Sequence, residues 1–453
     1  MEITFLLNGE TVALTNVKPT TTLLDWLREE RGLTGTKEGC NEGDCGACSV
    51  VVQDVDGQKA LNSCILFLPQ LNGKAVRTVE GLSAQDGTLH PVQDAMIKHH
   101  GSQCGFCTPG FIASMASAHA NGATDYDNQL AGNLCRCTGY APIIRAAEEA
   151  SAEPVPDWIK DELPPSPEAT SMQPVSSDAL ARLYAKMPEA TLVAGATDVG
   201  LWVTKSLRDL KPVIFLNRCA DLTEVEITED AINIGAMVNM NTLREVLTPY
   251  FPSYAEMLRR YASTQVRNAA TLGGNIANGS PIGDNPPALI ALNATLNLRL
   301  GDRRRSLPIE DFFIAYGKQD RLDGEFVESI SIPKQPDRLK VYKISKRFDQ
   351  DISAVLGAFN ITVEDGKIAA ARIAFGGMAA TPKRARHVED ALIGKAWNEE
   401  TIANAWKAWE QDFTPMSDMR ASADYRLEIA RNLLTRYYLE DLGAQTSVLE
   451  VQP

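Results

Sequence analysis

The sequence has no long hydrophobic segment and little positive charge relative to its negative charge. Its 453 residues include 58 Asp and Glu but only 44 Lys and Arg, so the net charge is −14. This charge argues against binding to nucleic acid or to anionic membranes. No apolar run reaches the roughly 18 residues that span a membrane. Residues 1–9 lack the basic and apolar regions of a secretory signal, so we expect a cytoplasmic protein.

Cysteine is unevenly distributed along a chain of otherwise ordinary composition. Hydrophobic residues make up 44% of the sequence and charged residues 23%, and the length predicts two to four domains. Eight of the nine cysteines lie before residue 138. The ninth, Cys219, stands alone, and we interpret it as a small buried residue.

The first four cysteines have the spacing of an iron–sulfur protein. Cys40, Cys45 and Cys48 form a C-x4-C-x2-C motif, and Cys64 follows after a strand-like run. This is the plant-type spacing for one [2Fe–2S] cluster. The glycines Gly39, Gly43 and Gly46 fit a loop that needs positive φ angles and N–H groups close to sulfur. The alternative is a set of buried or disulfide-bonded cysteines, which dense spacing in an intracellular enzyme disfavours.

The pattern around these cysteines predicts a small α+β ferredoxin-like domain over residues 1–82. Asn8-Gly9 is a hairpin signal, and Thr22 is a candidate helix N-cap. The expected strands are 3–7, 11–17, 48–53 and 75–79, and the expected helix is 22–31.

Residues 83–152 change to a helical pattern, with helices expected at 91–100, 110–121 and 140–150. Two cysteine pairs lie between these helices, Cys104-x2-Cys107 and Cys135-x-Cys137. A lone C-x2-C can also be a redox disulfide or half of a zinc site. Four cysteines suffice for a second cluster, so we expect the nearby histidines to be exposed or capping. These are His99, His100 and His119.

Six prolines in residues 153–177 predict an exposed, semi-rigid linker. Beyond it, 178–334 reads as an α/β domain with glycine-rich turns at 194–200 and 271–275. Neither turn is G-x-G-x-x-G, so a Rossmann fold is not supported. Their N–H groups suit a pyrophosphate, although plain tight turns explain each motif alone. Residues 335–445 predict a smaller α+β domain with a charged loop at 345–351, which is either a solvated turn or part of a site.

Three stretches together resemble the molybdenum hydroxylase family, which includes xanthine dehydrogenase. They are 37–48, Gly105–Gly110 and Gly132–Tyr140. The resemblance extends over the later domains in the family's order. It implies a β-grasp [2Fe–2S] domain, a helical-bundle [2Fe–2S] domain, an α/β FAD-binding domain and a C-terminal flavoprotein domain that closes over the flavin.

The resemblance also assigns residues to cofactors. The FAD positions are Leu192, Val193, Ala194, Gly195, Ala196, Thr197, Asp198, Val199, Tyr261, Thr271, Leu272, Gly273, Gly274, Asn275, Asp284, Val327 and Lys343. The two glycine turns would surround the pyrophosphate, and Asp284 would hold a hydroxyl of the flavin nucleotide. Tyr261, often phenylalanine in relatives, would lie near the isoalloxazine ring. Gln103 and Cys137 would lie against the pterin of a molybdenum cofactor held by a partner.

These assignments predict an electron-transfer subunit without a catalytic residue of its own. Electrons from hypoxanthine or xanthine oxidation would leave a large molybdopterin-binding subunit, cross two [2Fe–2S] clusters and FAD, and reduce NAD⁺. The family implies an (αβ)2 heterotetramer. The alternatives are the same role in an aldehyde- or N-heterocycle-oxidising enzyme, a free-standing electron carrier, and an iron–sulfur scaffold without redox function.

Overall fold

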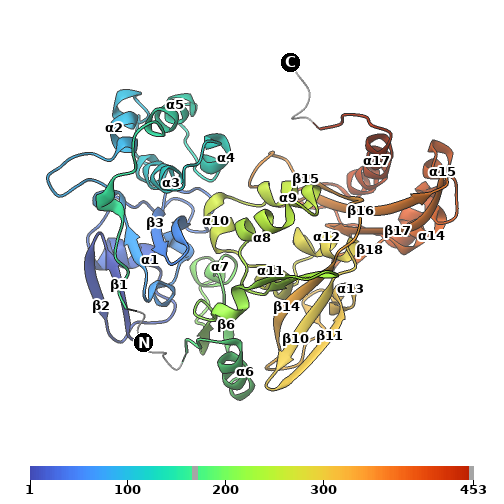
Figure 1. Cartoon of the computed structure of the whole chain (residues 1–453), viewed down its shortest axis with the longest axis horizontal. Helices are drawn as coiled ribbons and strands as arrows, with labels where there is room; N and C mark the ends of the chain where they lie inside the picture. The colour runs from blue at the N-terminus through green and yellow to red at the C-terminus, as the bar shows by residue number, and fades with distance from the viewer. Residues whose placement is uncertain (166–171, 448–453) are drawn as a thin grey trace.

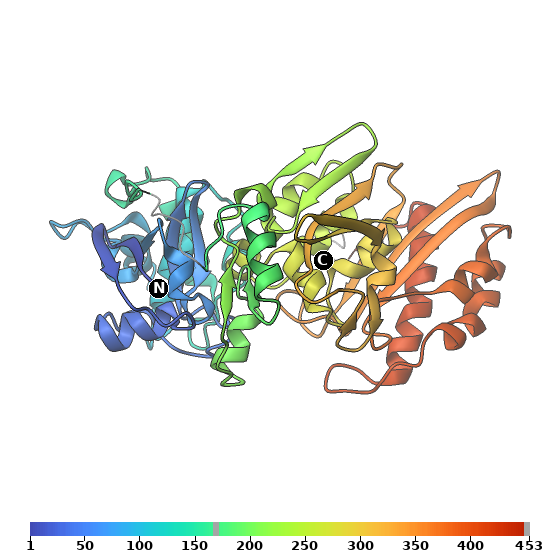
Figure 2. The ribbon, with the colours of Figure 1, turned by 90° about the horizontal axis from the view of Figure 1, so that it is seen from below.

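The computed structural model describes residues 1–165 and 172–447. The N-terminal domains form one lobe, and the C-terminal domain lies at the opposite end with the middle domain between them (Figures 1 and 2). Within the described ranges, no helix is both long and apolar enough to cross a membrane.

The N-terminal domain is a mixed five-stranded sheet with one helix packed on it. The strand order is β2(Glu10–Leu14), β1(Ile3–Leu7), β5(Ala75–Arg77), β3(Ser49–Asp54) and β4(Gly57–Asn62). Helix α1 (Leu23–Asp25) continues into a π-helical turn, Trp26–Glu30. The side chain of Thr22 accepts the Asp25 N–H, which confirms the predicted N-cap. The sheet and helix enclose a core of apolar side chains around Phe5 and Trp26.

The second domain is helical, as expected, with four helices. They are α2(Pro91–Lys98), α3(Thr108–Ala120), α4(Tyr126–Leu130) and α5(Ala141–Ala150). Helix α3 is almost entirely buried because it packs against β3 and β4 on one side and against the other helices on the other. The expectation that His119 is exposed or capping is wrong. It is 4% exposed, and its Nε2 lies 2.8 Å from the Glu153 carbonyl oxygen.

Much of the proline-rich segment is exposed, as its composition predicts, but the segment is also fixed to the N-terminal domain. Ile159 is buried, and Asp161 forms an ion pair with Arg77 at 2.7 Å. Farther on, Gln173 is buried and donates to the Pro69 carbonyl at 2.6 Å. Specific polar contacts therefore tie both described parts of this segment to the N-terminal domain. Residues 166–171 lie outside the described ranges.

The third domain combines a small parallel pair with a five-stranded antiparallel sheet. The pair is β6(Thr191–Val193) and β7(Val213–Phe215), preceded by α6(Ser177–Lys186). The sheet order is β11(Arg303–Pro308), β10(Thr295–Leu300), β14(Phe326–Pro333), β9(Ala231–Gly235) and β8(Val225–Ile227). The helices are α7(Val199–Thr204), α8(Met240–Leu247), α9(Pro252–Arg259), α10(Thr264–Ala269), α11(Leu272–Asn278), α12(Asn285–Ala291) and α13(Ile309–Phe312). A short hairpin, β12(Phe313–Ala315) and β13(Lys318–Gln319), precedes β14.

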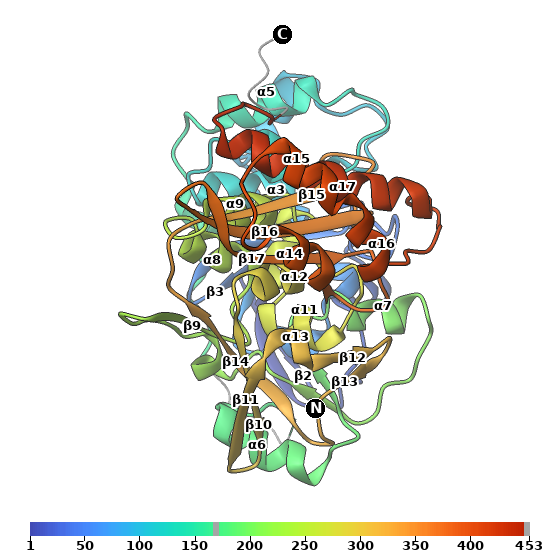
Figure 3. The ribbon, with the colours of Figure 1, turned by 90° about the vertical axis from the view of Figure 1, so that its right-hand side faces the viewer.

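The C-terminal domain is a four-stranded antiparallel sheet covered by helices on one face (Figure 3). Its strands are β15(Leu339–Ile344), β16(Val355–Glu364), β17(Lys367–Gly376) and β18(Lys383–Arg384). Its helices are α14(Arg386–Leu392), α15(Glu399–Asn404), α16(Trp409–Asp412) and α17(Ala423–Asp441). Strands β15 and β16 flank the charged loop, so the sheet fixes both of its ends.

Candidate cofactor sites

The first four cysteines form two pairs. The Sγ atoms of Cys48 and Cys64 are 3.3 Å apart, and the thiols of Cys40 and Cys45 contact each other. The Cys45 thiol and the N–H groups of Cys45 and Asp44 lower the pKa of Cys40 to about 5. The same contact, together with burial, raises the pKa of Cys45, so Cys40 is the partner that ionises first. The thiolate is the form that binds metal. Two pairs of thiolates suit the two irons of a [2Fe–2S] cluster.

The glycines of this loop have two different structural roles. Gly43 and Gly46 adopt positive φ angles of 77° and 69°, as expected. Gly39 does not, which corrects the prediction. A Cβ on Gly39 would lie 2.7 Å from the Cys45 Sγ, so this position needs the space rather than the backbone freedom.

The second four cysteines also form two pairs, Cys104 with Cys137 and Cys107 with Cys135. The Thr138 N–H donates to the Cys135 Sγ at 3.4 Å. Within 1–165 and 172–447, no three or more His, Cys, Asp or Glu side chains gather as a single-ion site would require. Two pairs of cysteines suit the two irons of a [2Fe–2S] cluster.

The surroundings of this second site are open. Cys104 and Cys137 are exposed, and so is Gln103. Three large apolar or aromatic side chains beside them are also exposed: Phe106 at 48%, Leu134 at 57% and Tyr140 at 38%. The second site therefore lies at an apolar part of the protein surface.

The two cysteine loops contact each other directly. The Leu134 N–H donates to the Cys45 carbonyl at 2.9 Å, and the Asn133 Nδ2 donates to the Gly46 carbonyl at 3.1 Å. A Cβ on Gly46 would lie 2.3 Å from the Gly132 carbonyl oxygen, so the backbones meet without an intervening side chain. The main-chain hydrogen bond joins Cys45, a predicted ligand of the first site, to the residue before Cys135, a predicted ligand of the second.

A glutamine from the third domain completes this junction. The Nε2 of Gln265, on α10, lies 3.0 Å from the Ser49 Oγ, 3.1 Å from the Ser114 Oγ and 2.9 Å from the Asn133 Oδ1. Gln265 is 1% exposed. One buried amide therefore holds the first domain, the second domain and the third domain together. Sequence reasoning missed this residue because no local pattern marks it.

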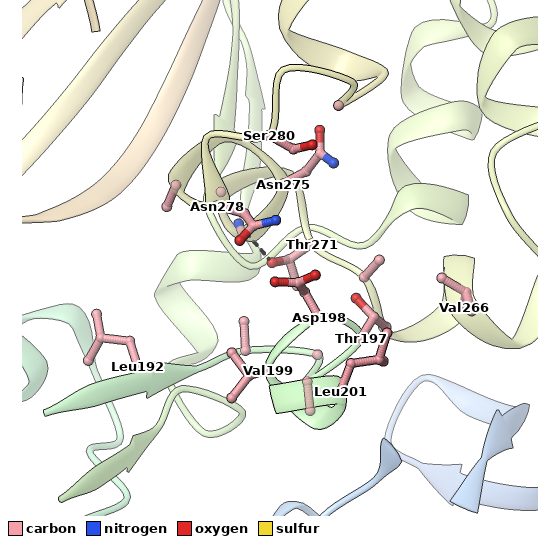
Figure 4. A pocket seen from close by; sticks show the side chains of 18 of the residues that line it. Leu192, Thr197, Asp198, Val199, Leu201, Val266, Thr271, Asn275, Asn278 and Ser280 are labelled. Atoms are coloured by element: carbon pink, nitrogen blue, oxygen red, sulfur yellow. Dashed lines mark hydrogen bonds between the residues drawn. The ribbon is translucent and has the colours of Figure 1, made fainter. Parts of the chain in front are cut away.

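A cavity of about 790 Å³ lies between the first and third domains. This volume is within the range of small-molecule and cofactor sites. Its walls include β6, the following turn and the start of α11, where Asp198, Thr271 and Asn275 project into the space (Figure 4). Of the predicted FAD residues, the cavity is lined by Leu192, Ala194, Gly195, Ala196, Thr197, Asp198, Val199, Tyr261, Thr271, Gly273, Gly274, Asn275, Asp284, Val327 and Lys343.

Two predicted FAD residues do not line the cavity. Val193 and Leu272 are fully buried in apolar clusters. The two turns need glycine mainly for close packing. A Cβ on Gly195 would lie 1.8 Å from the Ala269 carbonyl oxygen, and one on Gly273 would lie 2.5 Å from the Ala236 Cβ. One side of each turn therefore packs closely against a neighbouring segment of the protein, and the other side lines the cavity.

Asp284 and Lys343, predicted separately, form one buried ion pair. The Lys343 Nζ lies 2.6 Å from the Asp284 Oδ2 and 3.0 Å from the Ser353 Oγ. Ser353 in turn donates to the Asp284 Oδ1 at 2.6 Å. Pairing compensates the burial of both charges. Ser353, which the sequence did not indicate, links the segment after the charged loop to this pair.

Part of the first cysteine loop also lines the cavity. The lining includes Glu42, Gly43 and Asp44, which lie between Cys40 and Cys45. Residues 350–352, at the end of the charged loop, line the cavity as well. A pocket lined both by the glycine turns and by part of the first cysteine loop fits a flavin dinucleotide.

The charged loop is packed against the protein and is not a freely solvated turn. The Arg260 guanidinium lies 4.2 Å from the centre of the Phe348 ring and donates to the Phe348 carbonyl at 2.9 Å. Gln350 donates to the Ala131 carbonyl in the second domain. Arg347 pairs with Asp351. Burial raises the pKa of Asp198, which lines the same cavity, above its ordinary value.

Four sequence models match successive parts of the chain. They describe a 2Fe-2S iron-sulfur cluster binding domain over residues 5–68, a [2Fe-2S] binding domain over 78–148, an FAD binding domain in molybdopterin dehydrogenase over 167–335 and a CO dehydrogenase flavoprotein C-terminal domain over 340–441. The chain carries the iron–sulfur and flavin module of a molybdenum hydroxylase. The predicted fold class is thereby confirmed, whereas the individual ligand residues and domain boundaries stay predictions.

Known proteins similar to this module include several purine and aldehyde enzymes. Xanthine dehydrogenase from Calliphora vicina is 32% identical over 87% of this chain and 36% of its own length. Xanthine dehydrogenase 1 from Arabidopsis thaliana is 29% identical over 95% of this chain and 39% of its own. Aldehyde oxidase 2 from Macaca fascicularis is 29% identical, with 97% and 39% covered. The module thus spans about two fifths of the length of these relatives.

Two solved structures match part of the module. Carbon monoxide dehydrogenase from Hydrogenophaga pseudoflava gives a TM-score of 0.56 at 27% identity. Quinoline 2-oxidoreductase from Pseudomonas putida 86 gives a TM-score of 0.56 at 25% identity. Each match covers 60% of this chain and 96% of the solved chain.

Proposed function

We propose that this module is the electron-transfer subunit of a xanthine dehydrogenase-type enzyme, and that it connects a molybdenum site on a partner chain to NAD⁺. One observation carries the proposal: the cavity that fits FAD is lined by the loop between Cys40 and Cys45, and that loop is hydrogen-bonded to the second cysteine site. When bound, the clusters supply one-electron chemistry and the flavin supplies hydride chemistry.

The residues of the chain position these groups. The Cys48–Cys64 pair is buried, and backbone N–H groups point at the Cys40 sulfur. Such hydrogen bonds stabilise added negative charge and raise a cluster potential. The Leu134–Cys45 hydrogen bond and the Gln265 amide keep the two cysteine loops at a fixed separation. The chain thus forms an uninterrupted connection from its exposed cysteine site to its cavity.

The partner in this proposal is a large molybdopterin-binding subunit within an (αβ)2 heterotetramer. Support comes from the exposed apolar surface beside Cys104 and Cys137, where Gln103 also lies. A contiguous exposed apolar surface next to a redox site suits a protein contact. The similarity to xanthine dehydrogenases favours a purine as the substrate of that partner.

The proposed electron acceptor is NAD⁺, and the charges at the cavity support it. Asp198 and Asp351 line the cavity, and Arg347 is paired with Asp351 at its edge. Acidic side chains favour the positive charge of the oxidised nicotinamide, and an arginine favours the phosphates of the dinucleotide.

The test is an analysis of the enzyme purified with whatever large chain accompanies it. We expect about four iron and four labile sulfide atoms per small chain, with one FAD. We also expect faster xanthine turnover with NAD⁺ under nitrogen than with oxygen alone. A chain that purifies without a partner and with about two irons would overturn the proposal. Faster turnover with oxygen would overturn the assignment of NAD⁺.

A further inference from the structure

Four polar side chains form a continuous hydrogen-bonded row from the core of the third domain to the cavity. The Tyr254 hydroxyl donates to the Asn285 Oδ1 at 2.8 Å, and the Asn285 Nδ2 donates to the Asn275 Oδ1 at 2.9 Å. The Asn275 Nδ2 then lies 3.3 Å from the Tyr261 hydroxyl oxygen. Asn275 and Tyr261 line the cavity, and Figure 4 shows Asn275 projecting into it.

The direction of this row is fixed at its buried end. Tyr254 is 0% exposed, so its hydroxyl proton needs an acceptor within the protein, and Asn285 supplies one. If both amides were turned round, every hydrogen bond would reverse and the Tyr254 proton would be left buried without a partner. That would cost the full desolvation of the hydroxyl group. The Asn285 Nδ2 also lies 3.6 Å from the Met240 sulfur, a weak acceptor, which favours the same orientation.

This direction leaves the Tyr261 proton available at the cavity. Because Asn275 donates to the Tyr261 oxygen, the hydroxyl must send its own proton elsewhere. Among the residues that the structure describes, none accepts it. Burial, and then the Asp284 carboxylate, raise the pKa of Tyr261 above its ordinary value, so the hydroxyl keeps this proton at neutral pH.

We infer that the Tyr261 hydroxyl donates a hydrogen bond to an acceptor atom of the flavin ring, directed there by the row from Tyr254 through Asn285 and Asn275. This inference rests on the proposed function, because it places FAD in the cavity. Donors in a row polarise one another, so the last donor is strengthened. A fixed donor favours the state of the ring that carries more negative charge, which is the reduced state.

Replacing Tyr261 by Phe tests this directly because it keeps the ring and removes only the hydroxyl. The matched control is Tyr254→Phe, which removes the hydroxyl at the other end of the row, outside the cavity lining. Both variants of the full chain are compared with wild type by spectroelectrochemical titration of bound FAD and by FAD binding to the deflavinated protein. Thermal unfolding of each chain is measured in parallel.

In Y261F, we expect the affinity for reduced FAD, relative to that for oxidised FAD, to fall about tenfold. For a two-electron couple, this lowers the midpoint potential of bound FAD by about 30 mV. The FAD dissociation constant of this variant should rise several-fold. We expect Y254F to show less than half of this potential shift and the larger loss of thermal stability.

An unchanged potential and affinity in Y261F would overturn the inference. Equal potential shifts in both variants would also overturn it, because a general packing effect would then explain them. If the wild-type chain took up no FAD at all, the proposed function itself would fail. A failure confined to Y261F leaves the proposed function intact.

Discussion

The two cysteine sites use equal numbers of thiols, but the first site is the more buried of the two. In the first site, Cys48 and Cys64 are 2% and 1% exposed, and the loop faces an internal cavity. In the second, Cys104 and Cys137 lie at the surface. The difference shows that burial, and not ligand type, distinguishes the proposed roles. In the proposed function, the first site passes electrons inside the chain, and the second lies where another chain would bind.

The difference follows from where each domain places its cysteines. The first loop leads into β3, in a sheet that packs against the second domain through α3 and against the third through α10. In the second site, Cys107 immediately precedes α3, and Cys135 and Cys137 lie in the loop before α5. Ends of helices in a small bundle reach the surface, and their free N–H groups remain available to the sulfurs.

The largest expected effect comes from replacing one cysteine of each site in turn. Cys64→Ser should remove the first cluster and Cys104→Ser the second, because each cluster needs four thiolates. Iron should fall from about four to about two per chain in each variant, with loss of a different electron paramagnetic resonance signal. Cys219→Ser, at a buried cysteine outside both sets, is the control and should keep all the iron. Equal loss of both signals in either variant would contradict two independent sites.

The next effect breaks the junction between the sites. Gln265→Leu leaves the buried Asn133 Oδ1 without its donor and removes the link to Ser49 and Ser114. We expect a loss of about 4 kcal/mol in unfolding free energy, measured with urea, since several buried polar groups lose partners. Magnetic coupling between the reduced clusters should also weaken. Gln129→Leu, whose amide bonds only to the neighbouring Asp125, is the control. Equal losses in the two variants would contradict the role of Gln265.

Sequence reasoning found the chemistry of the sites better than their junction. Cysteine spacing is a local pattern, so both cysteine sets were predicted, and most of the FAD residues that the family resemblance implied line the cavity. The contact between Gln265 and Ser49 joins residues 216 positions apart, and no periodicity encodes it. The attachment of the proline-rich segment was missed for a similar reason, because no local pattern encodes the ion pair of Asp161 with Arg77 that holds it against the N-terminal domain.

A third effect distinguishes the two iron–sulfur domains by their response to acid. His90 is buried in the helical domain, and burial, followed by the neighbouring His119, lowers the pKa of His90 to about 4. Between this value and the ordinary 6.5, the unfolded chain binds the extra proton, so stability should fall as the pH falls from about 6.5 to about 4. The full effect is about 3 kcal/mol.

The control for this prediction is His90→Asn, which keeps an N-cap acceptor for the Val92 N–H but removes the titration. Urea unfolding across this pH range should show a shallower dependence in the variant, and the helical domain should be affected first. An identical pH dependence in both chains would rule out His90 as its source.

The smallest expected effect concerns two charged side chains at or near the cavity. Asp198→Ala and Arg347→Ala should each lower kcat/KM for NAD⁺ by about threefold to tenfold, the size of a partly exposed charge interaction. Reduction of both clusters by substrate should remain at wild-type rates, since neither side chain belongs to a cysteine site. Stopped-flow absorbance separates the two steps. Unchanged NAD⁺ kinetics in both variants would contradict the charge argument even if NAD⁺ is the acceptor.

The central claim is that one chain connects its internal cavity to its exposed cysteine site. The most direct test adds NADH anaerobically to the purified full chain, without its partner, and follows the flavin absorbance and the paramagnetic signals of the clusters. We predict that the flavin bleaches and that two distinct [2Fe–2S] signals appear, equal in total to those produced by dithionite. Bleaching of the flavin with only one cluster signal, or with none, would contradict the connection.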